Sequence, residues 1–308
     1  MIKTRKSRML PSWVSNDHPI VQRETALWKK RSRQWSWVWI IFLLLPLMCS
    51  GLCGLSMTPI LIEANSAGEW LFSIGAILSV TLWMLHGFLM FGIWLLSSIG
   101  TSTVIARERE TQNWSLLRIT TLNIPEIVHA KVIGVLRWLS LPLALAVVLR
   151  IAMSGLLFIV AILIIFSATV GVGATAPQLQ AVLVVASLAA CVIIAIYFII
   201  ELAAAMLYNC SIGLLSSVLA RTSANAIAIM FVLHFGISFF LIAPIQQVVI
   251  LAVSVFSLRW VSEANPVTQM ITPFITIGSS IIINLAIQIG IGVIAYALAV
   301  HQAKRIDE

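Results

Sequence analysis

The sequence predicts an all-α membrane protein of about six transmembrane helices, and three observations lead to this fold class. Of the 308 residues, 60% are hydrophobic and only 10% are charged, whereas an ordinary soluble domain is about half apolar and about a quarter charged. The apolar residues gather in runs of about 20 residues or more, the length that a helix needs to cross a bilayer. Lysines and arginines flank these runs. Lipid is therefore the expected solvent for most of the chain.

Residues 1–35 are expected to form a cytoplasmic amino-terminal segment, and residues 36–308 a single membrane domain. The spans are predicted at about 37–57, 70–104, 136–166, 181–208, 224–243 and 274–300. The fourth is expected to continue to Leu219 as a short helix near the inner surface. Because some 34 polar and basic residues precede the first run, it is interpreted as a retained span and not as a signal peptide.

The connection between the last two predicted spans, residues 244–273, is unusually apolar. Its run Val248–Phe256 is too short to cross a bilayer. A run of this length favours a re-entrant or interfacial helix on the external side.

The distribution of basic residues predicts the orientation. The amino-terminal segment, the 105–137 connection, the turn at Arg221 and the carboxyl-terminal tail hold 17 of the 19 lysines and arginines. The opposite side holds only Arg259, and Arg150 lies within a span. Positive residues mark cytoplasmic flanks, so both termini are predicted to be cytoplasmic in a multi-pass protein of the plasma (inner) membrane. Clustering at membrane flanks also argues against a nucleic-acid partner.

Motif searches argue against an enzyme. The sequence contains no P-loop, no H-E-x-x-H helix and no G-x-S-x-G elbow. No cofactor or catalytic residue is predicted. All four cysteines, Cys49, Cys53, Cys191 and Cys210, lie in or beside apolar runs. Cys49 and Cys53 share a helix face that could hold a soft metal, but packing is the favoured role, and no metal site is predicted.

The most informative stretch is the polar connection 105–131. It opens with four alternating charges, continues as a short amphipathic helix, and turns near 121–125 into a new helix whose first turn contains a proline. Lys131 and Arg137 are expected to anchor the third span at the inner interface. The residues assigned to partner coupling are Arg107, Glu108, Arg109, Glu110, Trp114, Leu117, Thr121, Pro125 and Glu126. The alternative interpretation is a solvated polar loop between two helices.

This stretch resembles the coupling-helix pattern of type-2 ABC exporter permeases. The resemblance is carried by the charged run 107–110, Trp114, Leu116-Leu117, Thr120-Thr121, Glu126-Ile127 and Lys131. Two positions depart from the pattern: Gln112-Asn113 replaces the usual Gly-Thr, and Leu122 replaces the proline after Thr-Thr. The segment Asn16–Glu24 likewise resembles the family's opening, which leads into a basic amphipathic elbow helix, here Thr25–Trp35. The elbow residues are Pro19, Arg23, Glu24 and Trp28, with Lys29, Lys30, Arg31 and Arg33 giving the helix its charge.

The resemblance implies a permease subunit of an ATP-driven exporter. It would work by alternating access and would contact a separate cytoplasmic ABC ATPase. A second permease, identical or paralogous, would complete a homo- or heterodimer in the lipid membrane. The alternative function is a non-transporting membrane scaffold or assembly factor that recruits a cytoplasmic partner through its polar loop.

Two charged residues and two histidines fall inside predicted spans: Arg150, Glu201, His86 and His234. Intramembrane charges usually face the bundle interior and are paired, so Arg150 and Glu201 are hypothesised to lie together between the third and fourth spans. In the other interpretation each is accommodated separately, Arg150 by snorkelling and Glu201 by protonation. The histidines are expected to be packed or to bond between helices.

Overall fold

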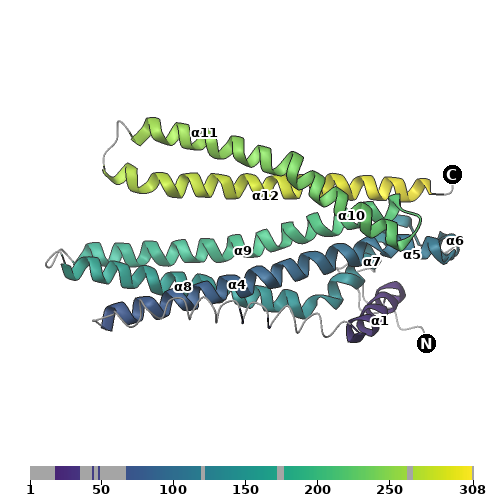
Figure 1. The fold of residues 1–308 in the computed structure, drawn as a ribbon, viewed down its shortest axis with the longest axis horizontal. Coiled ribbons are helices and arrows are strands. Elements are labelled where there is room, and N and C mark those ends of the chain that lie inside the picture. Colours follow the sequence, from purple (N-terminus) through teal and green to yellow (C-terminus); the bar gives the residue numbers. More distant parts are fainter. Residues whose placement is uncertain are drawn as a thin grey trace, which may run out of the picture. The chain divides into compact units, whose positions relative to one another are not determined.

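The computed structural model describes residues 18–34, 44, 48, 67–118, 122–171, 177–261 and 266–306, which contain helices and no strand. The helices are α1 (Pro19–Gln34), α4 (Ala67–Ser102), α5 (Val104–Glu110), α6 (Asn113–Arg118), α7 (Ile124–Trp138), α8 (Ser140–Gly171), α9 (Pro177–Leu219), α10 (Ser223–Ile237), a π-helix (Ser238–Ile242), α11 (Ala243–Val261) and α12 (Pro266–Arg305) (Figure 1). The predicted all-α class is confirmed for these residues.

Four of the described helical segments are long and apolar enough to cross a membrane: Ile77–Glu110, Cys191–Leu219, Ser223–Val249 and Ile282–Arg305. A bent pair, Ile124–Trp138 with Ser140–Leu156, makes a fifth if it is counted as one span. The four segments overlap the predicted second, fourth, fifth and sixth spans, and the bent pair overlaps the third; all are compatible with a membrane protein. The predicted first span, 37–57, lies outside the described residues except for Leu44 and Met48.

Prolines and caps account for several helix boundaries. Pro19, Pro177 and Pro266 are each the first residue of a helix, where a missing N–H costs nothing. Pro125 lies in the first turn of α7, as predicted. Pro142 has the opposite effect, because its ring would clash with the carbonyl of Trp138 and it donates no bond there. Helix α7 accordingly ends at Trp138, and α8 begins two residues later.

The structure differs from the predicted re-entrant segment 244–273. Helix α10 passes through the π-helix into α11 without a reversal, and α12 begins at Pro266 and runs through Pro273. The backbone N–H of Ala243 bonds to the carbonyl of Ser238, five residues earlier. This widened turn immediately precedes Pro244 and gives its ring room inside a continuous helix. Helices α11 and α12 then pack side by side (Figure 1).

Helix α9 also differs from its prediction, since it is one helix through Leu219 with no separate short helix at its end. The chain divides into two compact units. One comprises Met1–Thr25, Leu96–Arg137 and Ala203–Glu308, and the other comprises Ala26–Leu95 and Trp138–Leu202.

Within the first unit, small residues let α4 and α9 cross at close range. Ser97, Ser98, Thr101 and Ser102 on α4 and Ser216 and Ser217 on α9 are fully buried. At Gly213, a Cβ atom would lie 2.1 Å from Thr101 Oγ1 and 2.7 Å from the carbonyl oxygen of Ser98. Small residues at a helix crossing allow this backbone approach, as is common in membrane proteins.

Replacing Gly213 by alanine should therefore destabilise the protein by about 1–3 kcal/mol, the usual cost of overpacking. The matched control is Gly236→Ala, because a Cβ there meets nothing within 4 Å and alanine is the better helix former. Unfolding of both variants in detergent measures the difference. Equal stability of the two variants would contradict the close crossing.

Candidate functional site

A buried cluster of charges joins α1, α5 and α7. Lys131 on α7 is fully buried, and its Nζ lies 2.6 Å from Glu24 Oε1 on α1 and 2.9 Å from Glu108 Oε1 on α5. Arg23 Nη2 approaches Glu108 Oε1 at 3.7 Å, with about half of the Arg23 side chain exposed. These four residues are called the charge cluster below.

The charge cluster has a strong electrostatic requirement. Removing an ion from water costs several kcal/mol even after relaxation, and only close opposite charges offset that cost. Lys131 therefore requires both carboxylates, and each carboxylate requires Lys131. Arg23 contributes less because solvent screens an exposed pair. Glu108 Oε2 is buried with no hydrogen-bond partner among the described residues.

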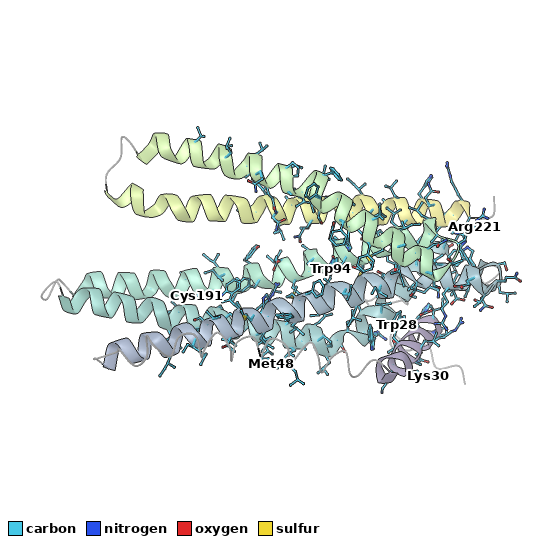
Figure 2. The ribbon with its side chains drawn as sticks, in the orientation of Figure 1. Trp28, Lys30, Met48, Trp94, Cys191 and Arg221 are labelled. Atoms are coloured by element: carbon cyan, nitrogen blue, oxygen red, sulfur yellow. The ribbon has the colours of Figure 1, made fainter. Side chains whose placement is uncertain are left out.

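Helix α1 approaches α7 closely enough to form this cluster because α7 carries Gly134. A Cβ at that position would lie 2.5 Å from Glu24 Cβ. Val21, Glu24 and Trp28 share the buried face of α1, while Lys29 and Lys30 are exposed. Trp28, labelled in Figure 2, stacks on Trp138 with ring centroids 5.0 Å apart. The predicted elbow segment is thus a helix, starting at Pro19 and not at Thr25.

A tight turn separates α5 from α6. Gln112 has a φ of 57°, in the left-handed region where side chains other than glycine are unfavourable. It occupies the position where the type-2 permease pattern usually has glycine. On the six-residue α6, Trp114 is buried and Leu116 is 64% exposed. Leu117 is half-buried on the same side as Trp114, in keeping with the predicted face.

The structure distributes the predicted coupling residues over several surroundings. Glu108 and Trp114 are buried, Glu110 is exposed, and Arg107, Arg109, Leu117, Pro125 and Glu126 are intermediate. Thr121 lies outside the described residues. Glu108 binds Lys131, whereas Arg109 and Glu110 bond to residues near the turn between α9 and α10. Three of the four residues in the charged run, Glu108, Arg109 and Glu110, therefore bond to other parts of the chain.

A second polar network lies among α4, α8 and α9. Arg150 Nη2 lies 2.7 Å from Glu201 Oε2. The two residues therefore form the ion pair that was hypothesised. Arg150 Nε donates to His86 Nε2 at 2.9 Å, and Nη1 donates to the carbonyl of Phe198. The guanidinium carbon lies 5.5 Å from the centroid of the Phe198 ring. Buried Arg150 thus ties three helices together.

Polar residues on other apolar helices also bond between helices, as expected for His234. His234 Nε2 on α10 lies 2.9 Å from Ser98 Oγ on α4. Gln246 Nε2 on α11 donates to Asn284 Oδ1 on α12 at 2.9 Å. Cys191 and Cys210 are free, and the described residues contain no group of three metal-ligating side chains.

Sequence reasoning missed three features of this site. Lys131 was expected at the membrane interface, but it is buried as the centre of the charge cluster. Gly134 permits the α1 approach, and Ser217 bonds to the start of α5. Nothing in the sequence around Lys131 and Gly134 indicates that a side chain from another helix lies against them.

Comparison of the chain with protein-family models, curated proteins and solved structures found no match.

Replacing Lys131 by methionine should destabilise the protein by about 3–5 kcal/mol, because two buried carboxylates lose their shared cation. The triple variant Glu24→Gln, Lys131→Met, Glu108→Gln should lie closer to the wild type, since no buried charge remains unpaired. Lys30→Met, which removes an exposed lysine from α1, is the control and should change stability by less than about 0.5 kcal/mol. Denaturant unfolding in micelles measures the stability of each variant. A Lys131→Met variant as stable as the control would contradict the stabilising role of the charge cluster.

Replacing Gln112 by glycine should stabilise the protein by about 0.5–1 kcal/mol, because relief of the left-handed strain outweighs the added freedom of the unfolded chain. Gln112→Val should be destabilising, since a β-branched residue tolerates a positive φ poorly. Ser115→Gly, on the helical part of the same segment, is the control and should lower stability. Thermal unfolding of the three variants is the measurement. A loss of stability in Gln112→Gly would contradict the turn geometry.

Proposed function

We propose that the chain is the membrane-spanning permease subunit of an ATP-driven exporter of the type-2 ABC class. The observation that carries this proposal is the charge cluster. Glu24 comes from one of the two segments that resemble the permease family, and Glu108 and Lys131 come from the other, with Lys131 within hydrogen-bonding distance of both carboxylates. Segments that match a family pattern independently and also meet at one buried ion support a shared function.

The proposed docking surface for the ATPase is the outer side of the α5–α6 turn and α6. Thr111, Gln112, Ser115 and Leu116 are exposed there, and Leu116 offers an apolar side chain to a pocket on a partner. Trp114, on the opposite side, is 2% exposed and holds α6 against the chain. A short helix with one exposed and one firmly packed side is suited to transmit a displacement from a partner to the rest of the chain.

In this mechanism, the ATPase displaces α6 when it binds and hydrolyses ATP. Only Thr103 separates α4 from α5, and only Leu139 separates α7 from α8. The second and third spans would therefore respond to the displacement and alternate between inward-open and outward-open states. The charge cluster would keep α1 moving with them. A second permease copy or paralogue would complete the pathway, and both termini would be cytoplasmic.

Replacing Leu116 by aspartate should reduce stimulated ATP hydrolysis at least tenfold, a change of about 1.4 kcal/mol in activation free energy, while leaving permease stability unchanged because Leu116 is exposed. The measurement uses permease co-expressed with an ABC ATPase encoded in a neighbouring reading frame and reconstituted in vesicles. His301→Asp, at another exposed site near the end of α12, is the matched control.

The same preparation separates the two functional hypotheses. Permease that never co-purifies with an ATPase, or that leaves hydrolysis unchanged, would contradict the proposal. A scaffold would bind its partner without any ATP-dependent solute movement into or out of the vesicles.

A further inference from the structure

The break between α4 and α5 is capped by a side chain from another helix. Thr103, at the N-cap position of α5, has helical dihedral angles and makes no side-chain cap bond. Instead, Ser217 Oγ on α9 accepts hydrogen bonds from the backbone N–H groups of Ile105 (2.8 Å) and Ala106 (3.0 Å). Two donors that a helix start leaves open are thus satisfied in trans.

Helix α5 in turn caps the end of α9. Arg109 Nη1 donates to the carbonyl oxygens of Val218, at 3.1 Å, and Ala220, at 2.8 Å. The Val218 carbonyl belongs to the last turn of α9, where it has no partner inside the helix, and Ala220 directly follows that turn. A cation at this end also complements the negative end of the helix dipole.

The next residue of α5 caps the start of α10. Glu110 Oε2 accepts hydrogen bonds from the backbone N–H of Ser223, at 3.2 Å, and from its Oγ, at 2.8 Å. Ser223 is the first residue of α10, where a carboxylate complements the positive end of the dipole. Arg221, labelled in Figure 2, lies in the turn between these two capped helix ends. We call Arg109, Glu110, Ser217 and Ser223 the capping clamp.

Packing around the capping clamp leaves little room for sliding. Ala106 on α5, Ala220 after α9 and Ala226 on α10 form one buried cluster, with Ile229 packed against it. Such small side chains hold the backbones of the three segments close together. The crossing at Gly213 also prevents α9 from moving freely past α4. Close-packed interiors of this kind transmit strain instead of absorbing it.

From this geometry we infer that the capping clamp joins α5, the end of α9 and α10 into one moving body, and that α6 moves with α5, against which it packs. Arg109 and Glu110 are then positioning residues that pass movement to the fifth span, and not contacts for the ATPase. The inference rests on the proposed function for the source of the movement. The inference adds a step to the proposed mechanism, because a displacement of α5 would move the fifth span directly and not only through the packing of that span against others.

Pulsed electron paramagnetic resonance between spin labels at Ser115 on α6 and Val232 on α10 tests the capping clamp. Both positions are exposed, and the four native cysteines are replaced by serine or alanine beforehand. In the isolated full-length chain, the wild-type background should give one narrow distance distribution. The double variant Arg109→Gln, Glu110→Gln should broaden it at least twofold, whereas Arg107→Gln, on the same helix, should not. Equal widths in the double variant and the wild type would overturn the inference.

A second arm adds the ATPase and ATP. Binding and hydrolysis are measured on chains without spin labels, because Ser115 lies on the proposed docking surface, and the unlabelled double variant should bind the ATPase and hydrolyse ATP as the unlabelled wild type does. In labelled chains with bound ATPase, the wild-type distance should stay constant through the cycle, whereas the double-variant distance should change with nucleotide. Loss of ATPase binding in the double variant would overturn the inference, since Arg109 and Glu110 would then be docking residues. If wild-type chain binds no ATPase, the proposed function fails, and the isolated-chain widths still decide whether the clamp exists. Ser223→Ala, which removes only a hydroxyl, is the milder variant if the double variant does not fold.

Discussion

The burial of Lys131 is the constraint on which the first compact unit depends. An ammonium group without access to water is stable only beside anions, and the two anions come from two other helices, one of them 107 residues away in sequence. Helices α1, α5 and α7 therefore cannot separate without leaving a charge unpaired in a medium of low dielectric constant. A purely apolar contact would permit small slips at little cost, whereas this cluster fixes the three helices at one distance. The absence of a Cβ at Gly134 makes that distance possible.

The helix ends around α5 extend this fixed arrangement. A helix terminus has unpaired backbone groups, and solvent usually satisfies them. Here Ser217, Arg109 and Glu110 satisfy them instead, and each belongs to a different helix from the one it caps. Backbone ends that depend on a neighbouring helix cannot move independently of it. The result is a joint in which three side chains link helix ends that a simple loop would leave independent.

The sequence predicts the helical class and the long apolar helices among the described residues, because long apolar runs leave the backbone no other way to satisfy its hydrogen bonds. Pro125 at the start of α7 follows from the same local reasoning. The charge cluster does not, because Glu24 and Lys131 are 107 residues apart, and neither residue's neighbours indicate a partner. Pro244 misleads for a different reason. Proline normally ends a helix, and only the widened turn at Ser238–Ile242 allows it inside one.

Arg150, on α8, illustrates how a buried charge on an apolar helix can be structural. Its guanidinium is directed at Glu201, His86 and the Phe198 carbonyl, and the side chain is 3% exposed. A solute that bound this arginine would have to replace partners already held at hydrogen-bonding distance, and each displaced polar group would be left unpaired where water is scarce. The network therefore favours holding α4, α8 and α9 together over binding cargo. Under the proposed function, the rigid polar contacts serve to transmit force, and selection of the transported solute falls to other surfaces of the spans.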